Sequence, residues 1–270
     1  MKTRTQIIIL VVLIVAGSSA VAVYVLKNQK GSYEQLPPTR EFDHSYTSLG
    51  HVLQNHVKDS KVDYAAIKSS PIHLNTFLDE AAALQRSIYD TWSDEQKLAF
   101  LINLYNAATI KLVIENYPVG NMKDIGNSLV TAWNKPVVRL FGDLVSLDHV
   151  EHKMIRKDFD EPRIHFAIVC AAVSCPPLRT EAYVPDRLSD QMDEQGIQFL
   201  ANTDKNRLDT ASKTAYLSKI FDWFGEDFTS DKKALLKSLS PWFSKSDQQK
   251  IAEGEWRVEF NKYDWSLNDK

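Results

Sequence analysis

The feature that most constrains this chain is an uncharged apolar run from Ile7 to Leu26. Its length matches the roughly 20 residues that a helix needs to cross a bilayer. A cleaved secretory signal is the alternative, because the small residues 17–20 resemble a cleavage site. The apolar run resumes after these residues, which favours an uncleaved signal anchor over residues 1–27. We therefore expect a membrane-anchored protein whose main body lies in the periplasm or otherwise outside the cytoplasm, or a secreted one if the signal is cleaved.

The polar segment 28–40 is typical of a linker, because it contains Gly31 and the pair Pro37-Pro38. No repeat or second linker follows, so residues 41–270 are expected to form one domain. Hydrophobic residues make up 44% of the chain and charged residues 25%, as in ordinary globular proteins. A net charge of −3 gives no basic excess, so we expect no nucleic-acid partner.

The first half of this domain has the periodicity of helices. Apolar residues recur at helical spacing over 44–57 and 71–84. A third helix begins after Ser93, which forms the pattern of a capping box with Gln96. This helix is apolar on nearly all sides and ends before Pro118, so we expect it at the centre of the core.

The second half mixes strands with helices. A hairpin is expected over 137–147, and the β-branched and aromatic run Arg163–Cys170 is expected to be a strand. Further helices are expected over 188–200, 232–239 and 247–253, and strands over 214–218 and 256–260. This order predicts an α+β domain in which a helical N-terminal half packs on a small, mostly antiparallel sheet.

Reactive side chains are concentrated between Asp148 and Arg179. A thiolate nucleophile needs a base within hydrogen-bond reach and a third group that orients the base. Cys175 follows the expected strand and precedes two prolines, and His152 or His165 would take its proton. Glu151, Asn103 or Asp264 would orient the imidazole.

Other interpretations of these residues remain open. Cys175 is also compatible with a packed thiol or with a disulfide to Cys170, for which the chain must turn back to bring the α-carbons about 4.4–6.8 Å apart. Cys170 itself shares a face with apolar residues, which favours core packing. Glu151 has the position of a helix-capping partner for Asp148.

Four further residues are candidates for binding or positioning. The amides of Asn103 and Asn106 lie on one face of the central helix, where they would orient an imidazole or hold a loop. Arg179 would clamp a substrate carboxylate or phosphate, or form a structural ion pair. Arg156, on the helix of Glu151 and His152, is a further binding candidate.

Metal and cofactor sites have weaker support in the sequence. His152, His165 and Cys175 would supply zinc ligands, but their spacing matches no short zinc motif. A glycine-rich phosphate loop, a dinucleotide fingerprint and an elbow serine are missing from the sequence. We therefore predict neither a metal nor a cofactor.

Several segments resemble one known family. They are Val62–Tyr64, Phe100–Ile110, Leu147–Arg156, Pro162–Arg179, Leu217–Phe228 and the C-terminal sequence YDWSLN. Together they resemble the domain-of-unknown-function family 547, from about Val62 to Asn268. The resemblance implies a domain that occurs in bacterial exported proteins, and it implies no established activity or catalytic residue.

These observations lead to three functional hypotheses. The first is a Cys–His acyl transferase or hydrolase that acts on an amide or thioester. The second is a non-enzymatic domain of the cell envelope that binds a ligand or a protein, and the third is a metal-dependent hydrolase. In each case the expected partners are an unidentified small molecule or peptide and, through the N-terminal helix, the membrane.

Overall fold

A computed structural model describes residues 41–127 and 129–270. The expected signal anchor and linker, residues 1–40, lie outside the described residues. Residues Phe42–Lys270 form one unit.

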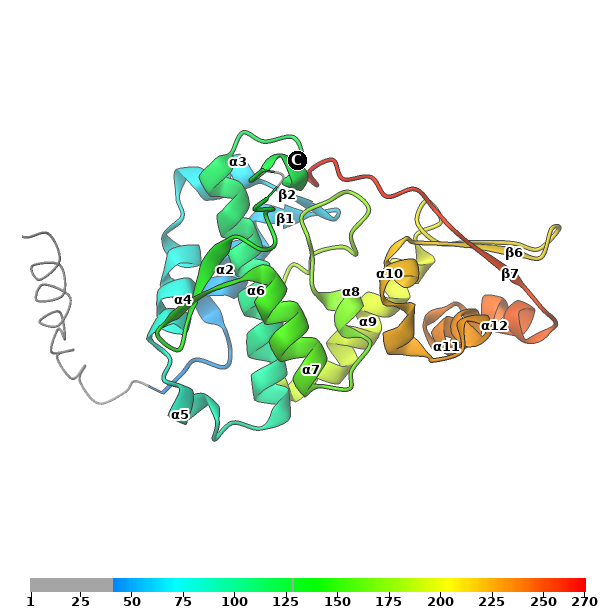
Figure 1. Cartoon of the computed structure of the whole chain (residues 1–270), viewed down its shortest axis with the longest axis horizontal. Helices are drawn as coiled ribbons and strands as arrows, with labels where there is room; N and C mark the ends of the chain where they lie inside the picture. Colours follow the sequence, from blue (N-terminus) through cyan, green and yellow to red (C-terminus); the bar gives the residue numbers. More distant parts are fainter. Residues whose placement is uncertain (1–40, 128) are drawn as a thin grey trace, which may run out of the picture. The chain divides into compact units, whose positions relative to one another are not determined.

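The buried helix α6 (Asp94–Asn116) organises the N-terminal part of this unit (Figure 1). It begins as predicted, because the Ser93 hydroxyl accepts from the Gln96 N–H and the Gln96 side chain accepts from the Ser93 N–H. Among the described residues, α6 is the one helix long and apolar enough to span a membrane. Yet 89% of its most apolar window is buried, as in the core helix of a globular domain.

Shorter helices surround α6. They are α2 (Thr47–His56), α3 (Tyr64–Ser69), α4 (Ile72–Ala83) and α5 (Arg86–Tyr89). Helices α3 and α4 contact α6 directly, and α2 packs on α4. The helical N-terminal half is therefore confirmed, and its apolar faces close over α6 to form the larger of two cores.

The strands form three small sheets instead of the single sheet that we expected. Antiparallel pairs join β1 (Val57–Lys58) to β2 (Lys61–Val62), and β3 (Pro136–Leu140) to β4 (Asp143–Ser146). The third sheet has the order β5-β6-β7 (Arg207–Asp209, Thr214–Leu217 and Arg257–Phe260), with β5–β6 antiparallel and β6–β7 parallel. The α+β class is confirmed, but its one-sheet form was wrong.

The strand expected over Arg163–Cys170 is wrong. Residues Ile164–Ala167 form one helical turn, α8, and an extended segment follows it. Short apolar runs do not distinguish a strand from a buried helical turn by periodicity. The extended residues after α8 bond to the Asn106 side chain instead of to a strand, since Asn106 accepts from the Val169 N–H and donates to the Ala167 carbonyl.

The C-terminal part forms a second core. Its helices are α9 (Leu188–Ala201), α10 (Ile220–Phe228), α11 (Leu235–Leu239) and α12 (Lys245–Ala252), which confirms the three helices expected there and adds α10. Short 3-10 turns at Met122–Asp124, Pro185–Arg187, Lys232–Ala234 and Ser240–Trp242 complete the unit, together with a π-helix and α7 (Arg156–Asp158) described below. Phe166 of α8 belongs to this second core, whereas its neighbour Ala167 belongs to the first. In Figure 1, α8 and α9 stand between α6 and the C-terminal helices.

The last residues of the chain return to the N-terminal part (Figure 1). The Val62 N–H donates to the Asn268 carbonyl, and the Tyr64 hydroxyl donates to the Asn268 side chain at 2.7 Å. Leu267 forms an isolated bridge with Ala172. The C-terminal segment is thereby held against the loop that contains both cysteines.

Candidate functional site

A cleft of about 160 Å³ lies where several segments of the unit meet. Its lining comes from helix α6, the π-helix His149–Ile155, α8 and the loop after it, helix α10 and the C-terminal segment, together with Trp133 and Asp148. The polar lining consists of Tyr105, Asp148, Glu151, His152, His165 and Tyr263. The apolar lining includes Trp133, Trp223, Phe224 and Trp265, together with both cysteines. The volume is close to that of a cavity that holds benzene, so the cleft admits a ligand of about one six-membered ring.

The π-helix positions Glu151 and His152. Its wider turn is marked by the Arg156 N–H, which donates to the Glu151 carbonyl five residues earlier. Such turns are rare and frequently occur at functional sites. Asp148 makes no capping hydrogen bond at the start of this helix, so the expected capping role of Glu151 was wrong.

Glu151 is a buried acid in the wall of the cleft. It is 7% exposed and forms no ion pair with any described residue. Its carboxyl group forms a hydrogen bond with the hydroxyl of Tyr105, which is itself buried in α6. Burial raises the pKa of Glu151 to about 7, although the hydrogen bond from Tyr105 lowers this pKa.

His152 lines the cleft. Its Nδ1 lies 3.2 Å from Nη1 of Arg156, and a guanidinium is always a donor, so Nδ1 accepts and Nε2 carries the proton. The Asp148 carboxylate is 4.0 Å from Nε2, beyond hydrogen-bond distance. Burial and the charge of Arg156 lower the pKa of His152, which favours this neutral tautomer.

His165 is held by an acid that the sequence analysis did not single out. Its Nε2 lies 2.7 Å from Asp227 of α10, and its ring stacks on Phe224 at 4.3 Å between centroids. Arg156 donates two hydrogen bonds of 2.7 Å to the same carboxylate. Burial opposes the ionisation of Asp227, but the bonds from His165 and Arg156 outweigh it and hold the carboxyl pKa well below its usual range.

Cys170 and Cys175 form a disulfide with their α-carbons 6.3 Å apart. The chain turns back between them through Ala171, whose φ is +60°, and through the hydrogen bond from the Cys175 N–H to the Ala172 carbonyl. The Cys175 sulfur, in a residue 2% exposed, accepts from the Cys170 N–H at 3.1 Å and from the Tyr263 hydroxyl at 3.2 Å. Neither histidine is hydrogen-bonded to it among the described residues, so the nucleophile predicted at Cys175 would exist only after reduction of the bridge.

Comparison with known proteins identifies the central part of this unit. Residues 89–200 match the family model described as "Protein of unknown function, DUF547". Over these residues the chain is similar to the DUF547 family. The match includes α6, the π-helix and both cysteines, and it confirms the resemblance seen in the sequence. No curated protein and no solved structure is significantly similar to the chain.

The two amides of α6 hold loops of the DUF547 segment. Asn106 bonds both sides of the extended residues 167–169, as described above. Asn103 donates to the Tyr183 carbonyl at 2.7 Å and accepts from the Tyr183 N–H at 3.0 Å. Of the two roles considered, both amides fill the loop-holding one, and Asn106 thereby positions the start of the cysteine loop.

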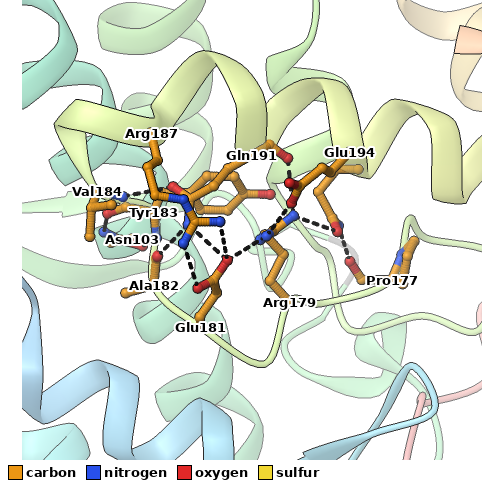
Figure 2. Close-up of polar contacts among 11 residues, drawn as sticks. Asn103, Pro177, Arg179, Glu181, Ala182, Tyr183, Val184, Arg187, Gln191 and Glu194 are labelled. Carbon is orange, nitrogen blue, oxygen red and sulfur yellow. Dashed lines mark hydrogen bonds and ion pairs between the residues drawn. The ribbon is translucent and has the colours of Figure 1, made fainter.

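Arg179 lies in an ionic network beside α9 (Figure 2). Its Nη2 atom contacts Glu181 at 2.5 Å and Glu194 at 2.7 Å, and its Nη1 donates to the Gln191 carbonyl. The side chain does not line the cleft. The structural ion pair considered for Arg179 is therefore present, and its guanidinium is already occupied by acids of the DUF547 segment.

The structure thus brings together four of the predicted site residues in one cleft, namely Glu151, His152, His165 and Cys175. Arg156 does not line the cleft but contacts His152, and Asn103 and Arg179 lie elsewhere. Sequence reasoning missed Tyr105, Asp227, Tyr263 and the tryptophans. Among the described residues, no group of three or more His, Cys, Asp or Glu side chains is arranged to hold a metal ion. The geometry therefore adds no support to the zinc interpretation.

Proposed function

We propose that the cleft is the active site of a hydrolase that cleaves a small uncharged ester, thioester or amide by acid–base catalysis. One observation carries the proposal. Glu151, a buried acid that forms no ion pair with any described residue, and His152, whose Nε2 carries a proton, line the same aromatic cleft. This retains the acyl chemistry expected from the sequence. The attacking group becomes water, because the Cys175 sulfur is bonded to Cys170.

Glu151 would act as the base. A carboxyl group whose pKa is raised to about 7 by burial accepts a proton from water more readily than an ordinary glutamate does. The Tyr105 hydroxyl bonds this carboxyl, so it fixes the orientation of the base. The low exposure of Glu151 also keeps bulk water from competing for its oxygens.

His152 would stabilise the developing oxyanion. Arg156 fixes the tautomer in which Nε2 carries the proton, and the His152 side chain lines the cleft and is 36% exposed. A fixed donor aimed at the oxygen where charge develops is worth about 10²–10³ in rate. The tryptophans would pack on the apolar part of the substrate, and the size of the cleft limits that part to about one ring.

The test is hydrolysis by the full-length chain in detergent without added thiol, with p-nitrophenyl acetate, phenyl thioacetate and acetanilide as substrates. At least one should be turned over. Glu151→Gln should lower kcat/KM at least about 100-fold, and His152→Gln about 100- to 1,000-fold. The control variants Glu253→Gln and His149→Gln, both exposed, should retain the wild-type rate. Turnover that survives Glu151→Gln would exclude the assigned mechanism, and saturable binding without turnover would favour the envelope-binding hypothesis.

We also propose that the unit works outside the cytoplasm, tethered by residues 1–27. The bridged cysteines support this location, since disulfides persist in oxidising compartments. Protease treatment of cells with a permeabilised outer membrane should digest or release the domain, and the mass of the purified chain distinguishes an anchor from a cleaved signal. Full protection in cells with a permeabilised outer membrane would contradict the proposal.

A further inference from the structure

The disulfide lies in the wall of the cleft, where a ligand reaches it. Both Cys170 and Cys175 line the cleft, and the two residues differ in exposure. Cys170 is partly exposed, whereas Cys175 is 2% exposed. Exchange between a thiol and a disulfide begins with attack on an accessible sulfur, so an incoming thiolate meets Cys170 first.

The surroundings of the second sulfur suit a leaving thiolate. The Cys170 N–H donates to the Cys175 sulfur at 3.1 Å, and the Tyr263 hydroxyl lies 3.2 Å from both sulfurs, so it can donate to Cys175 when the bond breaks. A disulfide sulfur is a weak acceptor, whereas a thiolate is a strong one, so these donors gain most when the bond breaks. Lys205 adds a cation beside the same residue, because its Nζ donates to the Cys175 carbonyl at 2.6 Å.

The bridge closes a short loop. The two cysteines are five positions apart, and the stabilisation that a disulfide provides through the unfolded chain grows with loop length. The fold of the loop has independent supports, because the Val173 N–H donates to the Ser266 carbonyl and the Asn268 N–H to the Ala171 carbonyl. The loop therefore keeps its attachment to the C-terminal segment when the bridge is reduced.

From these contacts we propose that the Cys170–Cys175 disulfide is a redox-active site that exchanges with a thiol-bearing ligand bound in the cleft. The ligand thiolate attacks the Cys170 sulfur, and a ligand–Cys170 disulfide forms as the Cys170–Cys175 bond breaks. The bonding electron pair goes to Cys175, which leaves as a thiolate and takes the proton released by the ligand thiol. A second ligand thiol then attacks the mixed disulfide. Two ligand thiols are thereby oxidised to one disulfide, and the protein is reduced to two cysteines.

The thiol comes either from a free small molecule or from a cysteine of a peptide, and two probes separate these sources. The full-length oxidised chain is incubated with cysteamine or with an N-acetylated Ala-Cys-Ala amide, quenched with acid and mapped by mass spectrometry. The mixed disulfide should form on Cys170 and not on Cys175. Faster reaction with cysteamine assigns the site to small thiols, and faster reaction with the peptide assigns it to peptide cysteines.

Variants test the roles assigned to the two sulfurs and to Tyr263. With cystamine as the probe, Cys175→Ser should form a stable adduct at Cys170, whereas Cys170→Ser should react at least about tenfold more slowly at the buried Cys175. Tyr263→Phe should slow reduction of the wild-type bridge about tenfold, and Tyr216→Phe, in β6, should not. Glu253→Gln, an exposed position outside the cleft, should leave exchange unchanged. The mapped adduct requires no hydrolysis of an ester or amide, so its outcome is independent of the proposed hydrolase.

Two results would overturn the assignment. One is a bridge that resists both probes in the native protein and is reduced only in urea, because it would then be a structural link. The other is a mixed disulfide found on Cys175 at least as often as on Cys170. Wild-type mapping needs no variant, so it remains decisive even if a substitution prevents folding.

Discussion

His165 and Asp227 are 62 positions apart in the sequence, yet Nε2 of one lies 2.7 Å from Oδ2 of the other. Their contact ties α8 to α10 across one wall of the cleft. Arg156 completes the group by bonding the same carboxylate. The wall therefore depends on one acid that satisfies an imidazole and a guanidinium together.

Replacing Asp227 should destabilise the protein measurably. Asp227→Asn leaves Arg156 and His165 without a charged acceptor in a half-buried position, and we expect a loss of at least about 2 kcal/mol in the free energy of unfolding. Glu226→Gln is the matched control, because Glu226 contacts the same Arg156 but its side chain is 78% exposed. Measured by urea unfolding, the control should lose less than about 1 kcal/mol in the free energy of unfolding. Equal effects of the two substitutions would contradict the role given to Asp227.

The buried carboxyl of Glu151 should make stability depend on pH. Unfolded glutamate loses its proton near 4.5, while Glu151 in the folded state holds its proton until about pH 7. Between these values the folded state binds more protons, so this residue lowers stability as pH rises and costs about 3 kcal/mol above the window.

Glu151→Gln removes this titration. The free energy of unfolding of the variant, minus that of the wild type, should increase by up to about 3 kcal/mol between about pH 4 and about pH 8. Denaturant curves at a series of pH values measure the difference. A difference that stays constant over this range would mean that Glu151 titrates like an exposed glutamate.

Replacing Asn106 should destabilise the protein more than replacing an exposed asparagine of the same helix. In Asn106→Leu the Ala167 carbonyl and the Val169 N–H lose their partner in the core, and each unsatisfied group costs about 1–3 kcal/mol. Asn116→Leu, at the end of the same helix, removes a bond to Leu112 within the helix and should cost less than about 1 kcal/mol. Thermal unfolding of both variants gives the comparison, and similar midpoints would show that the loop does not need this amide.

Two glycines in helices should respond to alanine in opposite directions. A Cβ at Gly196 would stand 2.8 Å from Trp242 and 2.9 Å from Phe166, so Gly196→Ala should cost about 1–3 kcal/mol. Gly50 in α2 has no atom within 4 Å of an added Cβ, and Gly50→Ala should stabilise the protein by about 0.5–1 kcal/mol. A stable Gly196→Ala protein would argue against close packing of α9 on α8.

The fold was predictable where the residues of one element are enough to determine its structure. Ser93 and Gln96 contain the whole signal for the start of α6, and the hairpin β3–β4 needs only its own residues and the turn at Phe141–Gly142. The strand expected at Arg163–Cys170 failed because Asn106, far away in the sequence, takes the hydrogen bonds that a neighbouring strand would have supplied. The single sheet failed for a related reason, since strand pairing is set by long-range packing.

The site was predictable in part. His152, His165 and Glu151 were identified from chemistry and closeness in sequence, and the structure places all three at the cleft. Asp227, Tyr105 and Tyr263 come from other elements, and no local pattern connects them to the histidines. The bridge was one of two interpretations of the cysteines, and the turn through Ala171 decided between them.

The most direct test of the proposed mechanism is the pH dependence of kcat/KM for the substrate that is turned over. If Glu151 takes a proton from water, the rate of the wild type should rise with pH through a midpoint near 7, where this carboxyl ionises. Glu151→Gln should be slower and should lack this rise. The same midpoint in the wild type and in Glu151→Gln would contradict the mechanism.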